Sequence, residues 1–426
     1  MPATITTEIQ RGVYACIAVM LFAAVPLARA ADWPQWRGPA RNGISAEQVA
    51  WPAGGPKQVW KADVGEGYSS VSVSQGRAYT MGLVEGQETV WCLDAKTGAV
   101  IWKYAYPGPR TTDTPRRKAR PSGFQDPYAD VPNSTPTVDG KLVYTVSRQG
   151  NLAALDAEKG TLIWSADYMK DFGSKKLRWG HAGSPLIEGE LLFVNVGVEG
   201  ASVVAFNKAT GKVVWKSGYD AIGFASPLAV TFGGQRTVTM FSATGLFAYN
   251  LADGKMLWNA EWASHHDGNA GDPIIFGDKV FISSTYGVGC CLLKVTDKGA
   301  TEVYRNKKFQ SHFPSPVLIG DMLYGITGHI NAKPVLVCLD PNTGDFKWEK
   351  PEVAASGLIA AGNTLLVQSA KGALVAVEAT PAGYKEIGSA PALPGGVCWT
   401  PPSLAEGRIY CRNAEGDVVC LDLSGK

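Results

Sequence analysis

Short apolar runs alternate with polar turns along nearly the whole chain, and one combination recurs at intervals of roughly 40 to 60 residues. Its clearest copies read LDAKTGAVIW at 93–102 and LDAEKGTLIW at 155–164. Each is the end of an apolar strand, a turn with glycine, and a second strand ending in tryptophan. Further copies end at Trp215, Trp258 and Trp348, and degenerate ones lie near 293–304 and 377–383. The glycine suits a turn that needs a positive φ, and the tryptophan can pack on the next unit.

A second pair of strands precedes each copy, so the repeating unit has four strands. The residues at 134–146 are an example, and their Ser/Thr-Pro opening returns at Ser184, Ser226, Ser315 and Thr400, with Asp272 before Pro273 as a variant. Proline is tolerated at the first residue of a strand. No segment shows a sustained helical period. Four-stranded units of this length predict the blades of a β-propeller.

The two ends of the chain predict how the ring closes. The last unit opens at Thr400 and stops at Lys426 without its tryptophan strand, whereas residues 58–61 form such a strand before the first complete unit. Pairing the two would leave no bare sheet edge. We therefore expect an all-β, eight-bladed propeller of four-stranded antiparallel blades. Seven blades are complete, and the last is closed by the N-terminal strand. Residues 31–426 form one domain, and residues 31–58 lead into it.

The N-terminus is typical of a secreted protein. Arg11 precedes an apolar run over 13–25, and the small-x-small pattern Ala28-Arg29-Ala30 follows it. We expect residues 1–30 to be a signal peptide cleaved after Ala30, and a periplasmic or extracellular protein without a transmembrane segment. Charge is nearly balanced, with 40 Lys and Arg against 38 Asp and Glu. This balance argues against a nucleic-acid partner. We expect a monomer.

Seven cysteines follow the signal peptide, and an oxidising compartment favours disulfides. Cys92, Cys338 and Cys420, however, stand where sister repeats have alanine, which predicts small buried side chains. The adjacent pair Cys290-Cys291 falls in a predicted third strand, where a disulfide would be strained because neighbouring Cα atoms lie about 3.8 Å apart. We expect separate thiols there. One bridge among Cys398, Cys411 and Cys420 stays open.

The repeat at 93–102 resembles the pyrroloquinoline quinone (PQQ) repeat. That repeat builds the eight-bladed quinoprotein alcohol dehydrogenases, the outer-membrane assembly factor BamB and many secreted bacterial propellers. The opening DWPQWRGP at 32–39, followed by Asn42-Gly43, is similar to the start of the last group. The resemblance covers essentially all of 31–426. It implies a fold, but the repeat residues are structural and carry no activity of their own.

Candidate site residues come from the segments just before each innermost strand, which meet at one mouth of a propeller's channel. A polar funnel with aromatic walls suits a ligand, whereas every propeller must also fill its channel with side chains. Adjacent histidines on an extended chain point opposite ways, so we expect no metal site at 265–266. The candidates are Tyr68, Asn133, Arg178, Trp179, His181, His265, His266, Asp267, Asn269, His312 and Trp399.

The stretch 107–130 is an irregular insertion between the first two blades, and it is rich in positive charge. Its basic residues are Arg110, Arg116, Arg117, Lys118 and Arg120. It is either a solvated loop or a surface that steers an acidic partner to the channel mouth.

Three functions fit these features. The first is a secreted or periplasmic, non-catalytic propeller that binds a protein or small ligand on its top face, similar to BamB but without a lipid-anchor signal. It has no catalytic residues and no cofactor. The second, implied by the resemblance, is a PQQ-dependent alcohol or sugar dehydrogenase with calcium, in which Asp267, Asn269 and Cys290-Cys291 would be tested. The third is a carbohydrate-binding propeller, indicated by Trp179 and Trp399.

Overall fold

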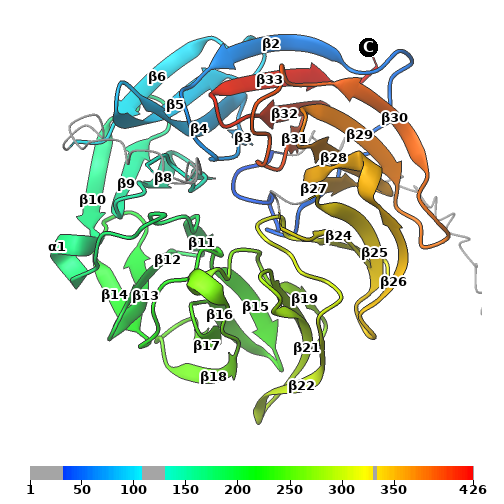
Figure 1. Ribbon diagram of the computed structural model, residues 1–426. Helices are drawn as coiled ribbons and strands as arrows, with labels where there is room; N and C mark the ends of the chain where they lie inside the picture. The colour runs from blue at the N-terminus through cyan, green and yellow to red at the C-terminus, as the bar shows by residue number, and fades with distance from the viewer. Residues whose placement is uncertain (1–31, 108–129, 330–332, 426) are drawn as a thin grey trace, which may run out of the picture.

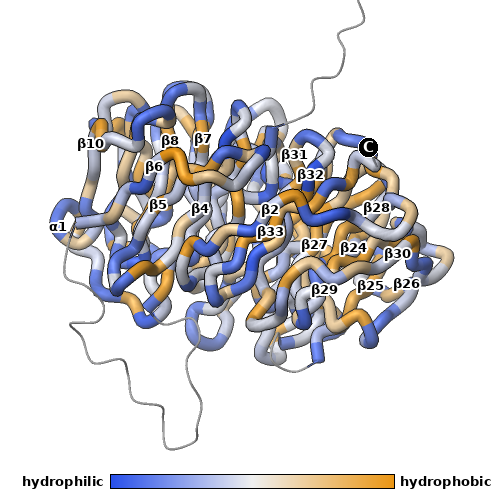
Figure 2. The backbone as a smooth tube through the Cα atoms, turned by 90° about the horizontal axis from the view of Figure 1, so that it is seen from above, coloured by the Kyte–Doolittle hydropathy of each residue, from blue (hydrophilic) through white to orange (hydrophobic). Residues whose placement is uncertain are grey.

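The protein is an eight-bladed β-propeller, as the repeats predict (Figure 1). The computed structural model describes residues 32–107, 130–329 and 333–425. The strands of a blade are antiparallel and run in chain order from the channel to the rim, apart from two N-terminal strands that join the last two blades. In a side view, hydrophilic turns lie mostly at the rims of the body and apolar strands within it (Figure 2). The predicted signal peptide lies outside the described residues.

The first four blades follow one another along the chain. Their strands are β3 (Ser72–Ser74), β4 (Arg77–Val84), β5 (Gln87–Asp94) and β6 (Val100–Ala105); β7 (Thr137–Asp139), β8 (Leu142–Val146), β9 (Asn151–Asp156) and β10 (Leu162–Asp167); β11 (Leu186–Glu188), β12 (Leu191–Val198), β13 (Ala201–Asn207) and β14 (Val213–Ser217); and β15 (Leu228–Phe232), β16 (Gln235–Phe241), β17 (Gly245–Asn250) and β18 (Met256–Glu261). The α-helix α1 (Tyr168–Phe172) follows β10.

The remaining blades complete the ring. Their strands are β19 (Ile274–Phe276), β20 (Lys279–Ser284), β21 (Gly289–Thr296) and β22 (Gly299–Asn306); β23 (Val317–Ile319), β24 (Met322–Thr327), β25 (Val335–Asp340) and β26 (Asp345–Lys350); β27 (Ala355–Ala361), β28 (Thr364–Ser369), β29 (Ala373–Glu378) and β30 (Glu386–Pro391); and β31 (Ser403–Ala405), β32 (Arg408–Arg412) and β33 (Asp417–Asp422) with β2 (Lys57–Asp63). The 3₁₀ turns are η2 (His265–Asp267) and η3 (Pro351–Val353).

The ring closes by the predicted exchange of ends. β2 pairs antiparallel with β33, with Trp60 opposite Cys420, and becomes the outermost strand of the eighth blade. One blade differs from the expected four strands. β1 (Ile44–Ser45) pairs in parallel with β27 at the channel side of blade 7, so that this blade has five.

Each repeat tryptophan joins its blade to the next one. The indole Nε1 of Trp60 donates to the carbonyl oxygen of Ala95 at 3.0 Å, and that of Trp102 donates to Ala157 at 3.0 Å. Gly98 has φ +74°, as the turn requires, and it also lies against the Trp60 ring. A Cβ on Gly98 would come within 2.7 Å of that ring. The glycine therefore serves both the turn and the docking of the neighbouring tryptophan.

The N-terminal segment 32–45 lies in the central channel, where Figure 1 draws it in dark blue. Trp33, which is 2% exposed, bridges to Val73 of β3, and Pro34 accepts a hydrogen bond from Val138 of β7. Arg37 donates to the carbonyl of Pro316 and Arg41 to that of Pro185, on opposite sides of the ring. The segment thus fills the channel and contacts several blades, a role that its sequence did not reveal.

The seven described cysteines are buried as free thiols. Cys290 and Cys291 lie in β21, the third strand of its blade, as predicted. Cys398, Cys411 and Cys420 share one apolar cluster of the last blade without a bridge. In the described part of the chain, no helix has both the length and the apolar character to cross a bilayer.

Candidate functional site

A belt of hydrogen bonds lines the channel at the Ser/Thr-Pro positions. The backbone N–H of each residue donates to the side-chain oxygen of its counterpart in the next blade. The successive bonds run from Ser70 to Thr135 (3.0 Å), Thr135 to Ser184 (2.9 Å), Ser184 to Ser226 (3.0 Å), Ser226 to Asp272 (2.9 Å) and Asp272 to Ser315 (2.7 Å). This belt fixes the starts of the innermost strands and the segments before them.

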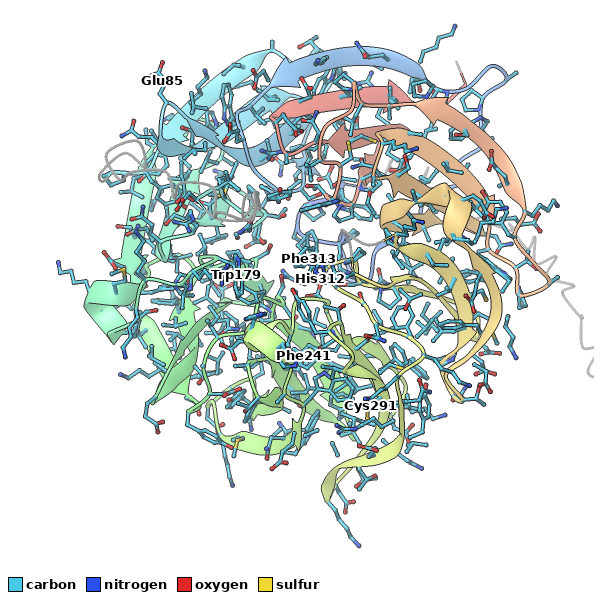
Figure 3. The ribbon with its side chains drawn as sticks, in the orientation of Figure 1. Glu85, Trp179, Phe241, Cys291, His312 and Phe313 are labelled. Carbon is cyan, nitrogen blue, oxygen red and sulfur yellow. The ribbon has the colours of Figure 1, made fainter. Side chains whose placement is uncertain are left out.

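Above the belt, those segments enclose a cavity of about 440 Å³ at the channel mouth. Aromatic side chains dominate its walls. Trp179, His312 and Phe313 lie around the centre of the ring, whereas Cys291 lies farther out within its blade (Figure 3). The size falls within the range of about 300–1,000 Å³ usual for small-molecule sites.

Seven of the eleven predicted site residues line this cavity, and they come from six of the eight blade junctions. They are Tyr68, Asn133, Arg178, Trp179, His266, His312 and Trp399. Tyr68 and Trp399 stack with centroids 5.7 Å apart and planes at 13°, and the Arg178 guanidinium lies 4.7 Å from the Trp179 ring centroid. Residues from distant repeats therefore meet in one place.

The other four candidates do not line the cavity. His181 is 2% exposed and packs edge-on against Tyr168 at 5.0 Å, because the chain turns it beneath the surface at Gly180. Asn269 is fully buried, and its amide donates to the carbonyls of Ser242 and Trp262. His265 and Asp267 are exposed in η2 and lie off the cavity wall.

Three of the other lining residues lie outside the segments from which the candidates were taken. Tyr286 follows β20 and His329 follows β24, so both belong to connections between the second and third strands of a blade. Those connections reach the same face as the segments before the innermost strands. Trp36 comes from the N-terminal segment. A propeller blade brings two of its connections to each face, and this regularity could have located Tyr286 and His329.

The basic loop cannot be placed relative to the cavity. Its residues Arg110, Arg116, Arg117, Lys118 and Arg120 lie outside the described residues. The role of the loop in steering a partner stays a prediction.

Asp272 holds the cavity floor in place. Its Oδ2 accepts from the indole of Trp36 at 2.6 Å, and it pairs with the Arg37 Nε at 3.9 Å. Burial lowers the pKa of Arg37 and of Arg41 to about 10, and the Asp272 carboxylate opposes this shift. Asp272 is therefore the counter-charge for two buried arginines of the N-terminal segment.

Two imidazoles on the cavity wall, those of His312 and His329, are held neutral. Burial lowers the pKa of His312 to about 3, helped by His329, whose ring centroid is 4.2 Å away. Burial also lowers the pKa of His329. The Tyr286 hydroxyl lies 3.2 Å from His312 Nε2. A neutral imidazole has one donor and one acceptor nitrogen, so these rings offer both kinds of hydrogen bond.

A buried polar cluster supports the Arg178 segment from below. Glu88 is 6% exposed and its Oε2 accepts from the backbone N–H of Arg148 at 2.9 Å. The Arg148 carbonyl accepts from the His181 N–H, and its guanidinium pairs with Asp130 at 3.3 Å. Burial raises the pKa of Glu88 to about 7 and lowers that of His181 to about 4.

Glu88 and His181 make the free energy of unfolding depend on pH in opposite directions. Folded Glu88 keeps its proton between its usual pKa of about 4.5 and about 7, whereas the unfolded chain has lost it, so the free energy of unfolding falls as pH rises through this window. His181 acts in the other direction. Because it is neutral in the folded protein, the free energy of unfolding falls as pH falls from about 6.5 towards about 4.

We compare the free energy of unfolding of Glu88→Gln with that of the parent at two pH values. The difference should favour the variant by roughly 2–3 kcal/mol more at about pH 8 than at about pH 5. The amide keeps an acceptor for the Arg148 N–H but carries no charge to desolvate. Chemical unfolding at both pH values measures the difference. Glu85→Gln is the matched control, since Glu85 is exposed and points outwards (Figure 3). An equal effect at both pH values would contradict the raised pKa of Glu88.

The residues present do not fit PQQ with calcium as the resemblance implied. Calcium prefers six to eight oxygen ligands, several of them carboxylates. Among the described lining residues Asp272 is the single carboxylate, and it is already paired with Arg37. Cys290 and Cys291 are fully buried in two apolar clusters of their blade. No described group of three or more His, Cys, Asp or Glu side chains is arranged to hold a metal ion.

The chain is similar to proteins named as an assembly factor and as a hydrolase. The chain is 25% identical to the outer membrane protein assembly factor BamB of Burkholderia pseudomallei over 316 residues, 73% of this chain and 63% of that protein. It is 24% identical to the tetrathionate hydrolase of Acidithiobacillus ferrooxidans over 54% of this chain and 44% of that protein. The match thus spans less than two thirds of these relatives.

Solved structures show the same fold. The crystal structure of BamB from Moraxella catarrhalis matches with a TM-score of 0.60 at 17% identity, covering 87% of this chain and 98% of that one. The quinohemoprotein alcohol dehydrogenase ADHIIG of Pseudomonas putida matches with a TM-score of 0.64 at 15% identity, covering 93% and 80%.

The family model described as outer membrane protein assembly factor BamB matches residues 50–116 and 116–350. These matches cover more than half of the chain and span repeats from the first blade to the sixth. The chain therefore belongs to the BamB family of PQQ-repeat β-propellers.

Proposed function

We propose that this chain is a non-catalytic binding propeller of the cell envelope, secreted or periplasmic, whose channel mouth receives a protein partner or a small ligand. The observation that carries the proposal is the cavity itself. Its walls are largely aromatic, and its single described carboxylate, that of Asp272, already contacts Trp36 and Arg37. Such a site offers shape and stacking surface for recognition. Among its described lining residues, the one carboxylate is taken up by Trp36 and Arg37, so no second carboxylate supports paired acid–base chemistry there.

Membership of the BamB family supports this reading, and the assembly role named for BamB relatives is one form that it can take. The dehydrogenase alternative is supported by similarity to quinohemoprotein alcohol dehydrogenases. The described residues of this cavity wall, however, include neither a set of calcium ligands nor the Cys290-Cys291 pair.

The catalytic alternative is tested by titrating the purified protein with PQQ, with and without calcium, and assaying dye reduction with alcohols and sugars. We expect no turnover under any of these conditions. Calcium-dependent, saturable quenching of tryptophan fluorescence together with dye reduction would overturn the non-catalytic assignment.

Recognition at the channel mouth is tested by native mass spectrometry of the protein isolated from its host. We expect additional bound mass that is lost in Trp179→Ala. Tyr219→Ala is the control, because Tyr219 is 51% exposed and lies off the cavity wall. Bound mass that is the same in both variants, or absent from the parent, would contradict the mouth as the recognition site.

A further inference from the structure

The cavity wall carries two groups of rings that face the same space. The stacked pair Tyr68 and Trp399 comes from the junction of the first and last blades. The second group is built edge to face: Trp179 meets His266 at 5.6 Å and 79°, and His266 meets Tyr286 at 5.8 Å and 81°. Rings at right angles present both flat faces and polar edges to a ligand.

Two of these rings are held by unusual backbone conformations. His266 has φ 63° and Tyr286 has φ 61°, the left-handed region that favours glycine. Non-glycine residues stay there only where their surroundings fix them, and such positions gather at ligand sites. Both residues line the cavity and their rings contact each other, so these backbone positions hold two rings together at the wall.

The polar groups of the wall both donate and accept hydrogen bonds. His312 and His329 are neutral, since burial lowers the pKa of each, and a neutral imidazole has one nitrogen of each kind. Asn133 adds an amide with both kinds of atom, and Arg178 adds donors. The Arg178 cation already lies over the face of Trp179, so a cationic ligand would be repelled there.

We propose that the cavity binds a carbohydrate, with the apolar face of a sugar ring stacked on Trp179 or on the Tyr68–Trp399 pair. The hydroxyl groups then exchange hydrogen bonds with the imidazoles, Asn133 and Arg178. A sugar ring combines an apolar face with edges that donate and accept, which matches this wall. A planar aromatic carboxylate offers hydrogen-bond acceptors alone, and so matches it less well. This inference rests on the proposed binding function and names its ligand class.

The test is isothermal titration calorimetry of the full chain with three neutral disaccharides: maltose, cellobiose and N,N′-diacetylchitobiose. We expect at least one to bind saturably, with a loss of about tenfold or more in Trp179→Ala or Trp399→Ala. Two separate variants keep the test open if one of them fails to fold. Tyr219→Ala should bind as the parent does.

Two results would overturn the carbohydrate assignment. One is the absence of binding of all three sugars up to ~10 mM, a weak limit on the usual affinity scale. The other is binding that Trp179→Ala and Trp399→Ala leave unchanged. Binding of 2-naphthoate in place of the sugars would assign the cavity to planar aromatic anions instead. Mouth-dependent bound mass in native mass spectrometry would stand after any of these results, so failure of the ligand class is distinguishable from failure of the proposed function.

Discussion

A chain that begins at Val64, without residues 32–63, should fail to form the folded ring. This truncation removes β2, the outermost strand of blade 8, together with the segment that fills the channel. The outer edge of β33 would then be bare, and the last blade would have three strands in place of four. We expect an aggregated or largely unfolded product, or one whose Tm lies more than ~10 °C below that of the parent.

The size of this effect follows from what the segment buries. Trp60 is 6% exposed and Trp33 is 2% exposed, and both pack in the apolar cluster that joins blade 8 to blade 1. Removing one buried tryptophan side chain typically costs about 3–5 kcal/mol. Because whole domains are usually stable by only about 5–15 kcal/mol, losing both rings with a strand leaves little net stability.

A chain that begins at Pro56 is the informative control, since it keeps β2 and loses the channel segment. Circular dichroism and thermal melting of both truncations separate the two contributions. We expect the longer chain to fold with a lowered Tm and the shorter one to lose the cooperative transition. A protein starting at Val64 that melts like the parent would contradict the composite blade.

The fold was predictable because its determinants are local and repeated. A glycine turn followed by tryptophan marks the outer hairpins of the first four blades and of the sixth, and the structure gives the physical reason: the indole of one blade packs on the turn glycine of the next, as Trp60 does on Gly98. The missing last strand could be predicted as well, because Trp60 precedes the first complete unit and belongs to no other unit. A repeated sequence pattern therefore indicates a contact that successive blades make in the same way.

Contacts made only once leave no such pattern. Arg37 and Arg41 look like surface residues of a polar lead segment, yet each is about 5% exposed within the channel. The sequence did contain one signal. Asp272 stands where other blades have serine or threonine, and the belt bond from Ser226 requires only an oxygen there. The second carboxylate oxygen and its charge serve the N-terminal segment.

The candidate site was only partly predictable for a related reason. Topology placed the segments before the innermost strands at one face, and seven of the eleven candidates taken from them line the cavity. Which side chains turn inwards depends on the local backbone: in one turn, His266 lines the cavity, whereas the neighbouring His265 and Asp267 do not. His181 is withdrawn by the turn at Gly180. Such single-residue conformations are not encoded in the repeat.

Asp272→Asn should be the most damaging conservative substitution in the channel, with an expected loss of about 3–5 kcal/mol in the free energy of unfolding. The Asp272 side chain is 2% exposed, and its two oxygens accept from different donors, the Ser226 N–H and the Trp36 indole. An amide has one oxygen, so one of these donors would face an NH₂ group. Arg37 and Arg41 would also lose their shared counter-charge while still buried.

The measurement is chemical unfolding of Asp272→Asn beside Asp278→Asn. Asp278 is the matched control, because its side chain is 54% exposed and its Lys294 partner lies 3.7 Å away in solvent; removing such a pair typically costs less than about 1 kcal/mol. Since Trp36 lines the cavity, the folded fraction of Asp272→Asn should also lose any ligand binding that the parent has. Equal stability of the two variants would mean that the backbone carbonyls of Pro185 and Pro316 suffice to hold the buried arginines, and that the channel segment does not depend on Asp272.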